Sequence, residues 1–167
     1  MAASTKDYKS YLLNKCIIGY GVINGVINAL IFLGINAGNP DALFWQGKII
    51  EEMALTGVLL GLILTWCVVP LTKIDLRKGV YRGQAGAYGF TEKLPVKAVP
   101  MSLAVGVIAL VAVVVISGLA SFVLPLPLSR TGMMVFKGVM CAVTGGISGY
   151  CVIGRVTSAY VPEAKAA

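Results

Sequence analysis

The stretch that decides the fold class is residues 16–36, CIIGYGVINGVINALIFLGIN, which contains no charged side chain. A helix of this length rises about 30 Å, which is the thickness of the hydrocarbon core of a bilayer. Hydrophobic residues make up 57% of the 167-residue chain, charged residues only 13%, and the mean hydropathy is +0.86. Because an ordinary soluble domain is about one quarter charged, the sequence predicts an integral membrane protein.

Three more stretches have no charge in their middle and are long enough to cross a bilayer: residues 53–71, 101–124 and 134–154. The chain length leaves room for one domain. We therefore predict an all-α fold, an integral membrane four-helix bundle made of two αα-hairpins. It forms a single transmembrane domain over residues 1–167, with a loop at residues 72–99 between the hairpins.

Local signals predict the ends of the third and fourth spans. Pro100 precedes the third span, and Pro125 and Pro127 follow it, so these prolines are expected to limit its helix. Lys137 is expected in the first turn of the fourth helix, where a long side chain can snorkel to the interface. The third span is poor in small residues, and we expect it to be the helix most exposed to lipid.

Basic residues are unevenly distributed between the two sides of the predicted bundle. Eleven belong to the two tails and the 72–99 loop: Lys6, Lys9, Lys15, Lys73, Arg77, Lys78, Arg82, Lys93, Lys97, Arg155 and Lys165. The other side has three: Lys48, Arg130 and Lys137. Because cytoplasmic flanks retain positive charge, the sequence predicts both termini inside, in a bacterial-type inner membrane or a plasma membrane.

The basic loop is a candidate surface for contact with anionic lipid headgroups or with a partner protein. The candidate contact residues are Lys73, Arg77, Lys78 and Arg82. The aromatic residues Tyr81, Tyr88 and Phe90 are expected to settle at the headgroup level. Such a surface accounts for the net charge of +7, so we expect no nucleic-acid partner.

Small residues recur at four-residue spacing in three of the spans. Helices in lipid associate through close backbone contact, so these positions are candidates for helix packing. They are Gly21 and Gly25; Gly57 and Gly61; and Gly138, Ala142, Gly145, Gly146 and Gly149. The sequence leaves open whether these faces pack within one bundle or between copies of the chain.

Polar side chains occur at mid-depth in two of the spans. Asn24 and Asn28 are one helical turn apart, with Tyr20 on the same face, and Thr144 and Ser148 are similarly spaced in the fourth span. Two interpretations remain open. These groups bond to each other or to backbone carbonyls, or they line a path for an ion or a neutral solute.

Several chemical roles are disfavoured by what the sequence lacks. There is no histidine, the usual ligand of haem and the commonest zinc ligand. The four cysteines form no C-x-x-C pattern, which favours free thiols. No hydrolase motif, nucleotide-binding loop or mid-span carboxylate is present. We therefore expect no enzymatic activity, no cofactor and no metal.

Two functions agree with these features. The first is a small non-enzymatic protein that serves as a subunit, scaffold or homo-oligomer in a membrane complex, with lipids and other subunits as its partners. The alternative is a small transporter or channel whose path uses the Asn, Thr and Ser side chains of the first and fourth spans.

Overall fold

A computed structural model describes residues 7–82 and 89–166, with side chains described as far as residue 160. Lys6, Tyr88 and the side chain of Lys165 lie outside this part of the chain. The predicted all-α class is confirmed. The elements are α1 (Tyr8–Leu13), η1 (Asn14–Val22), α2 (Ile23–Ile35), β1 (Leu43–Phe44), α3 (Gln46–Arg77), η2 (Gly89–Lys93), α4 (Ala98–Ala120), β2 (Leu128–Ser129) and α5 (Arg130–Ala166).

Four helices are long and apolar enough to cross a membrane, which indicates a multi-pass membrane protein. They are Tyr8–Ile35, Gln46–Arg77, Ala98–Ala120 and Arg130–Tyr160. The first of them combines α1, η1 and α2 into one continuous rod, in which η1 is wound as a π-helix. In this arrangement backbone amides are paired within each helix, as a bilayer interior requires.

The helices extend beyond the apolar stretches that predict them. Residues 72–77 of the expected loop belong to α3, because charged residues end a membrane span without ending a helix. The signal that does end α3 is Gly79, whose φ of 65° lies in the left-handed region. The Val80 amide then donates to the Asp75 carbonyl at 3.0 Å and closes the helix end.

The expected bounds of the third helix are wrong at both ends. α4 begins at Ala98, so Pro100 lies within its first turn, where a missing N–H breaks no helical hydrogen bond. The helix ends at Ala120, four residues earlier than expected, and the following residues form turns before Pro125 is reached. The prolines thus mark the approximate region of each end and not the terminal residue.

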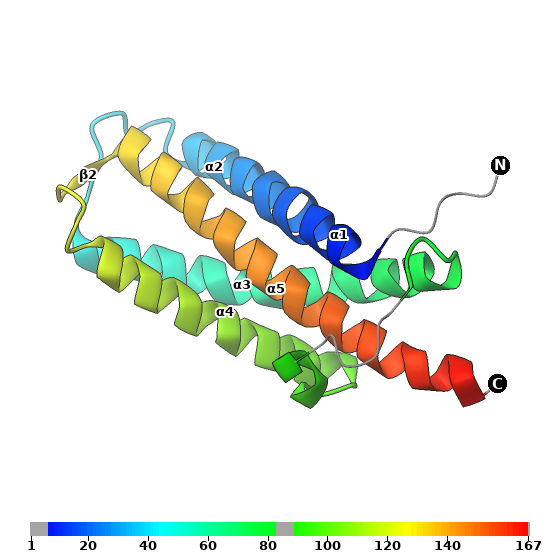
Figure 1. Cartoon of the computed structure of the whole chain (residues 1–167). Helices are drawn as coiled ribbons and strands as arrows, with labels where there is room; N and C mark the ends of the chain where they lie inside the picture. Colours follow the sequence, from blue (N-terminus) through cyan, green and yellow to red (C-terminus); the bar gives the residue numbers. More distant parts are fainter. Residues whose placement is uncertain (1–6, 83–88, 167) are drawn as a thin grey trace.

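The first and last helical turns of the chain lie at the same end of the bundle (Figure 1). The start of α1 and the last turns of α5 are at one end, called here the terminal end, and the two short strands are at the opposite end (Figure 1). There β1 and β2 pair antiparallel, with Leu43 opposite Ser129 and Phe44 opposite Leu128. This pairing ties the loop between α2 and α3 to the loop between α4 and α5.

Helix α5 is the central element of the bundle. In its most apolar stretch 61% of residues are buried, against 28–33% in the other three long helices. α2 and η1 lie along α5, while α3 and α4 pack against each other and also contact α5. The contacts between helices do not follow the two expected hairpins: α3 and α4, which the 72–99 loop was expected to separate into different hairpins, pack against each other, and the first helix has α5 as its main neighbour.

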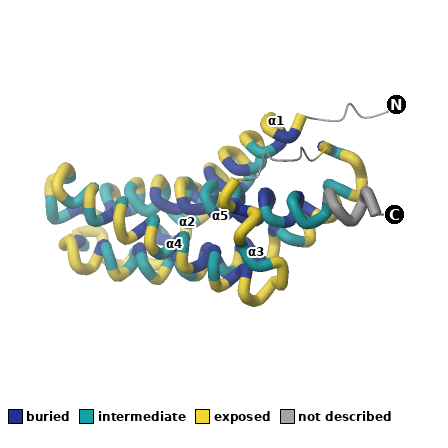
Figure 2. The backbone as a smooth tube through the Cα atoms, turned by 60° about the horizontal axis from the view of Figure 1, so that its bottom comes forward, coloured by how far each residue is buried: buried dark blue, intermediate teal, exposed yellow. Residues whose placement is uncertain are grey.

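The outward surfaces of the helices are exposed along their length (Figure 2), and many of the side chains there are apolar. Exposed side chains follow four-residue spacing: Ile23, Ile27 and Ile31 on α2; Leu55, Leu59 and Ile63 on α3; and Leu103, Val107, Val111 and Val115 on α4. The expectation that α4 is the most exposed helix is wrong, because the first helix has the same low buried share of 28%. Because the first helix packs mainly against α5, most of its side chains remain exposed.

The central position of α5 predicts a difference between two glycine-to-alanine changes. A methyl group at Gly145 would clash with the Tyr20 carbonyl, whereas one at Gly118 in α4 would meet nothing within 4 Å. We expect Gly145→Ala to destabilise the protein by ~1–3 kcal/mol, as overpacking does. The matched Gly118→Ala should be neutral or stabilising by up to ~1 kcal/mol, because alanine favours helix.

Thermal unfolding of both variants in the same mild detergent measures this difference. If Gly145→Ala unfolds at the wild-type temperature, the close approach of η1 to α5 is contradicted.

Candidate functional site

The contact between the first helix and α5 is made by glycine backbones. A methyl group added at Gly25 would lie 2.6 Å from the Gly138 carbonyl oxygen and 2.9 Å from the Ala142 Cβ. One added at Gly21 would lie 3.1 Å from the Ala142 carbonyl oxygen. The predicted small residues of these two helices therefore face each other, and only glycine allows the backbones to approach this closely.

The same contact continues toward the terminal end around Tyr20. This side chain is buried, and its ring atom Cδ2 lies 2.7 Å from the Cβ position of Gly149. Gly146 lies against the Cys16 carbonyl at 3.3 Å, measured from the Cβ position. Tyr20 thus fills the space that the glycines of α5 leave open, which makes it a packing residue at this interface.

A second glycine contact joins α3 to α4. The Cβ position of Gly57 is 3.0 Å from the Val113 Cγ2, and that of Gly61 is 2.8 Å from the Gly106 Cα. Gly106 was not among the predicted packing residues, because no small residue follows it at four-residue spacing that would have drawn attention to it. The second GxxxG pair therefore faces α4 and not the first helix.

The two asparagines of the predicted polar layer bond within their own helix. The Asn24 amide donates to the Tyr20 carbonyl at 2.7 Å, and the Asn28 amide donates to the Asn24 carbonyl at 2.9 Å. Both side chains are half-buried. Each amide therefore finds an acceptor one turn back, in the manner that polar side chains use when few other partners are near.

The hydroxyl groups of the polar layer lie on α5 and are buried. Thr144 donates to the Met140 carbonyl at 2.8 Å, again within its own helix. Among the described residues the Ser148 hydroxyl has no hydrogen-bond partner. No hydrogen bond between described residues joins either hydroxyl to Asn24 or Asn28, and Thr144 borders a crevice lined by residues of α3 and α4, so the five predicted residues do not form one polar layer.

Lys137 has a different role from the one expected. α5 begins at Arg130, so Lys137 lies beyond its first turn, and its side chain is only 12% exposed. Its ammonium group pairs with the Glu52 carboxylate at 2.9 Å and lies 5.3 Å from the centre of the Phe32 ring. The side chain therefore links α5 to α3 and α2 at the opposite end, where snorkelling to the interface was expected.

A cluster of tyrosines joins the elements at the terminal end. Tyr8, Tyr11 and Tyr81 are each 2% exposed, and the rings of Tyr11 and Tyr81 stack with centres 3.8 Å apart. The Tyr81 hydroxyl is 2.7 Å from that of Thr157 on α5. Tyr81 is thus held between α1 and α5 and does not lie on the outer surface of the bundle.

Asp75 is the charged centre of this end. Its carboxylate accepts a hydrogen bond from the Tyr11 hydroxyl at 2.7 Å and pairs with the Lys15 ammonium at 3.1 Å. Sequence reasoning missed this residue, although Asp75 is the one acidic residue in the basic run 73–82. A lone carboxylate among so many cations was the available signal that it had a specific partner.

The remaining basic residues of the terminal end have no carboxylate partner among the described residues. They include the predicted lipid-contact residues Lys73, Arg77, Lys78 and Arg82, together with Lys93, Lys97 and Arg155. At the opposite end, Lys48 pairs with Glu51 at 3.2 Å, and Arg130 donates to the Asn36 carbonyl at 3.3 Å. Uncompensated positive charge is therefore concentrated at the terminal end.

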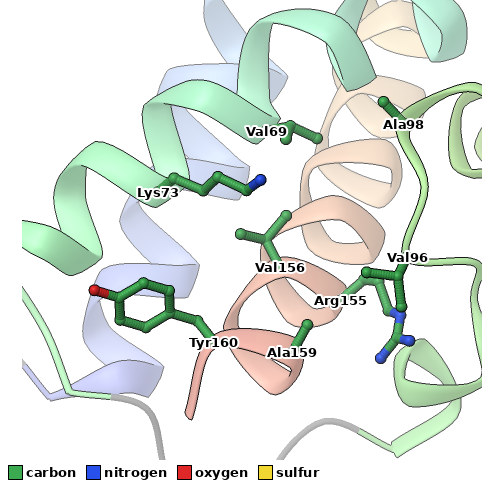
Figure 3. Close-up of a pocket in the computed structure, with 8 residues that line it drawn as sticks. All are labelled: Val69, Lys73, Val96, Ala98, Arg155, Val156, Ala159 and Tyr160. Atoms are coloured by element: carbon green, nitrogen blue, oxygen red, sulfur yellow. The ribbon is translucent and has the colours of Figure 1, made fainter. Parts of the chain in front are cut away.

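Two cavities lie at the terminal end. One has a volume of about 130 Å³ and includes Lys73 and Arg155 in its wall (Figure 3). The other has a volume of about 280 Å³ and is lined by Tyr11, Asn14, Lys15, Asp75 and Val80. Neither is lined by Asn24 or Asn28.

The middle of the bundle is more tightly packed. The crevice around Thr144, between α3, α4 and α5, has no room for a water molecule. A shallow apolar groove of about 390 Å³ opens outward between η1 and α5, over Gly21, Ala142 and Gly146. Thr144 thus lies in a packed crevice, and neither Asn24 nor Asn28 lines any of these cavities.

Searches against protein-family models, curated proteins and solved structures found no match to this chain. Any functional assignment therefore rests on the geometry of the bundle and on the charges at its two ends.

The pair between Lys137 and Glu52 gives a test of the opposite end. Lys137→Met removes the partner of a carboxylate that is only 27% exposed, so we expect a loss of ~1–3 kcal/mol in stability. Adding Glu52→Gln should restore most of that loss, since no unpaired charge then remains. Lys48→Met breaks an exposed pair and should cost under ~0.5 kcal/mol.

The free energy of unfolding of the wild type, the two lysine variants and the double variant measures the contribution of each ion pair to stability. Equal stability of the Lys137→Met and Lys48→Met proteins would show that the interhelical pair contributes no more than a surface pair.

Proposed function

We propose that this chain is a non-enzymatic multi-pass membrane protein that serves as a subunit, a scaffold or a homo-oligomer in a membrane complex. The observation that carries the proposal is the use of its mid-depth polar groups. Asn24, Asn28 and Thr144 each donate to a carbonyl of their own helix, and the crevice beside Thr144 has no room for water. Such an interior suits a rigid helical unit better than a path for solute.

The outer surface also supports a structural role. Rows of exposed Ile, Leu and Val side chains cover α2, α3 and α4, and they offer apolar faces to lipid tails or to helices of other subunits. Three connections join the four long helices, and the described residues of these connections form no soluble domain. Its contacts with partners would therefore be made mainly within the membrane and by the basic terminal end.

The charges at the two ends support a membrane position. Glu52 and Asp75 lie on the same helix, about 35 Å apart at 1.5 Å per residue, close to the thickness of a hydrocarbon core. Each carboxylate is paired with a lysine of another helix, Lys137 and Lys15 respectively. We infer that these two pairs lie near the two faces of the bilayer, with the basic terminal end on the cytoplasmic side.

Measurement of particle mass in native lipid tests the subunit role. We expect membranes extracted into polymer nanodiscs, without detergent, to yield particles that contain more than one 17.5 kDa chain or an additional subunit. The added mass should survive dilution, as a specific assembly does. Particles that contain a single copy of this chain and no other subunit, at every expression level, would contradict the proposal.

The alternative function is transport of an ion or a neutral solute along a path that includes Asn24 and Asn28. We expect liposomes containing wild-type protein to be no more permeable to Na⁺, K⁺, protons or glycerol than empty liposomes. Asn24→Leu and Asn28→Leu should change stability by ~1 kcal/mol or less, since each amide bonds only within its own helix and a single hydrogen bond contributes about that much. The exposed Val26→Leu is the matched control on the same helix.

Solute flux through the wild-type protein that disappears in Asn24→Leu, at an unchanged melting temperature, would contradict a purely structural role for the mid-depth polar side chains. Flux that survives in both asparagine variants would equally contradict the non-transport role, and would place the path elsewhere in the bundle.

A further inference from the structure

A cavity at the terminal end has the features of an anion site. It lies between the last turns of α3, the start of α4 and the last turns of α5, with a volume of about 130 Å³, several times what one water needs (Figure 3). Two cations, Lys73 and Arg155, belong to its wall, and none of the described lining residues is acidic. A cavity with this composition attracts negative charge.

Arg155 is only partly satisfied by the protein itself. One guanidinium nitrogen, Nη1, donates to the Ser158 hydroxyl at 3.2 Å, while Nε is buried and has no partner among the described residues. A buried N–H donor without an acceptor is costly, and charged donors cost more than neutral ones. An anion in the cavity would supply the missing acceptor.

The helix that borders the cavity adds to its positive potential. Ala98, the first residue of α4, is in the wall, and no side chain caps this helix start. The N-terminal turn of a helix carries partial positive charge and free N–H groups, both of which favour an anion. The two cations and the helix start therefore act on one small volume.

Apart from the two cations and Tyr160, the wall is formed by valine and alanine residues. Val69 lies one turn before Lys73 on α3, and Val156 follows Arg155 on α5. An inorganic phosphate ion has no apolar group to pack against the valine side chains. A phospholipid would place its phosphate between the cations and its first methylene groups against the valines.

We propose that this cavity binds the phosphate of an anionic phospholipid and thereby holds the ends of α3, α4 and α5 together. The proposal rests on the membrane position inferred above, and it adds Arg155 to the basic residues predicted to meet lipid. It requires no particular oligomeric state.

Binding of phosphatidylglycerol to the full-length protein in a maltoside detergent tests the site. Thermal melts and native mass spectrometry report stabilisation and retained lipid, with phosphatidylcholine and inorganic phosphate as the comparison ligands. We expect phosphatidylglycerol alone to raise the melting temperature substantially. Lys73→Gln with Arg155→Gln should weaken its apparent affinity by about 25-fold, at about fivefold for each cation near an anionic headgroup.

The matched control is Lys9→Gln with Lys93→Gln, which removes the same charge at the terminal end from exposed positions outside the cavity wall. It should retain most of the affinity. Arg155→Lys keeps the charge and guards against a folding defect, so it should also retain most of the binding.

Equal loss of affinity in the two double variants would overturn the site, because general surface charge would then explain the binding. Stabilisation by inorganic phosphate but not by phosphatidylglycerol would overturn the lipid assignment. No preference for phosphatidylglycerol over phosphatidylcholine would overturn the anion site altogether. Each of these results is independent of the particle mass in nanodiscs, so the subunit proposal and the lipid site can fail separately.

Discussion

The structure depends on the close approach of the first helix to α5, where glycine on one side meets backbone on the other. Gly25 lies against Gly138, and Gly145 lies against the Tyr20 carbonyl. Lipid tails are as apolar as the helices, so burial of apolar area gives little drive for association, and packing at this distance has to supply it. Because α5 also contacts α3 and α4, its small face lets one helix hold the bundle together.

The two ends of the bundle supplement this packing with polar contacts. At one end, Lys137 joins α5 to Glu52 of α3 and to the ring of Phe32 on α2. At the other, Asp75 joins α3 to Tyr11 and Lys15 of the first helix. These contacts link the first helix to α3 at both ends, although the main contact of its middle is with α5. A bundle fixed in this way is suited to act as a rigid unit.

Much of this architecture could be predicted from the sequence, because length, absence of charge and small-residue spacing are local properties. The helices, their number and the glycines of the two close contacts other than Gly106 follow from such patterns. Which helices would face each other could not be predicted: Gly57 and Gly61 have the same spacing as Gly21 and Gly25, yet they face α4. The partners of Asp75 and Lys137 were missed for the same reason, since they lie more than 50 residues away in the sequence.

The most direct test of the account is a disulfide between the first helix and α5 in a background without the four native cysteines. The Cβ of Ala29 lies 3.3 Å from the Cβ position of Gly138, just under the separation of about 3.5–4.5 Å found in disulfides, so a shift of a few tenths of an ångström allows the bond. Oxidation of Ala29→Cys with Gly138→Cys in native membranes should give an intramolecular crosslink in most molecules, whereas Ala29→Cys with Leu55→Cys should not. Efficient intramolecular crosslinking of Ala29→Cys to Leu55→Cys, with none to Gly138→Cys, would contradict the central position of α5.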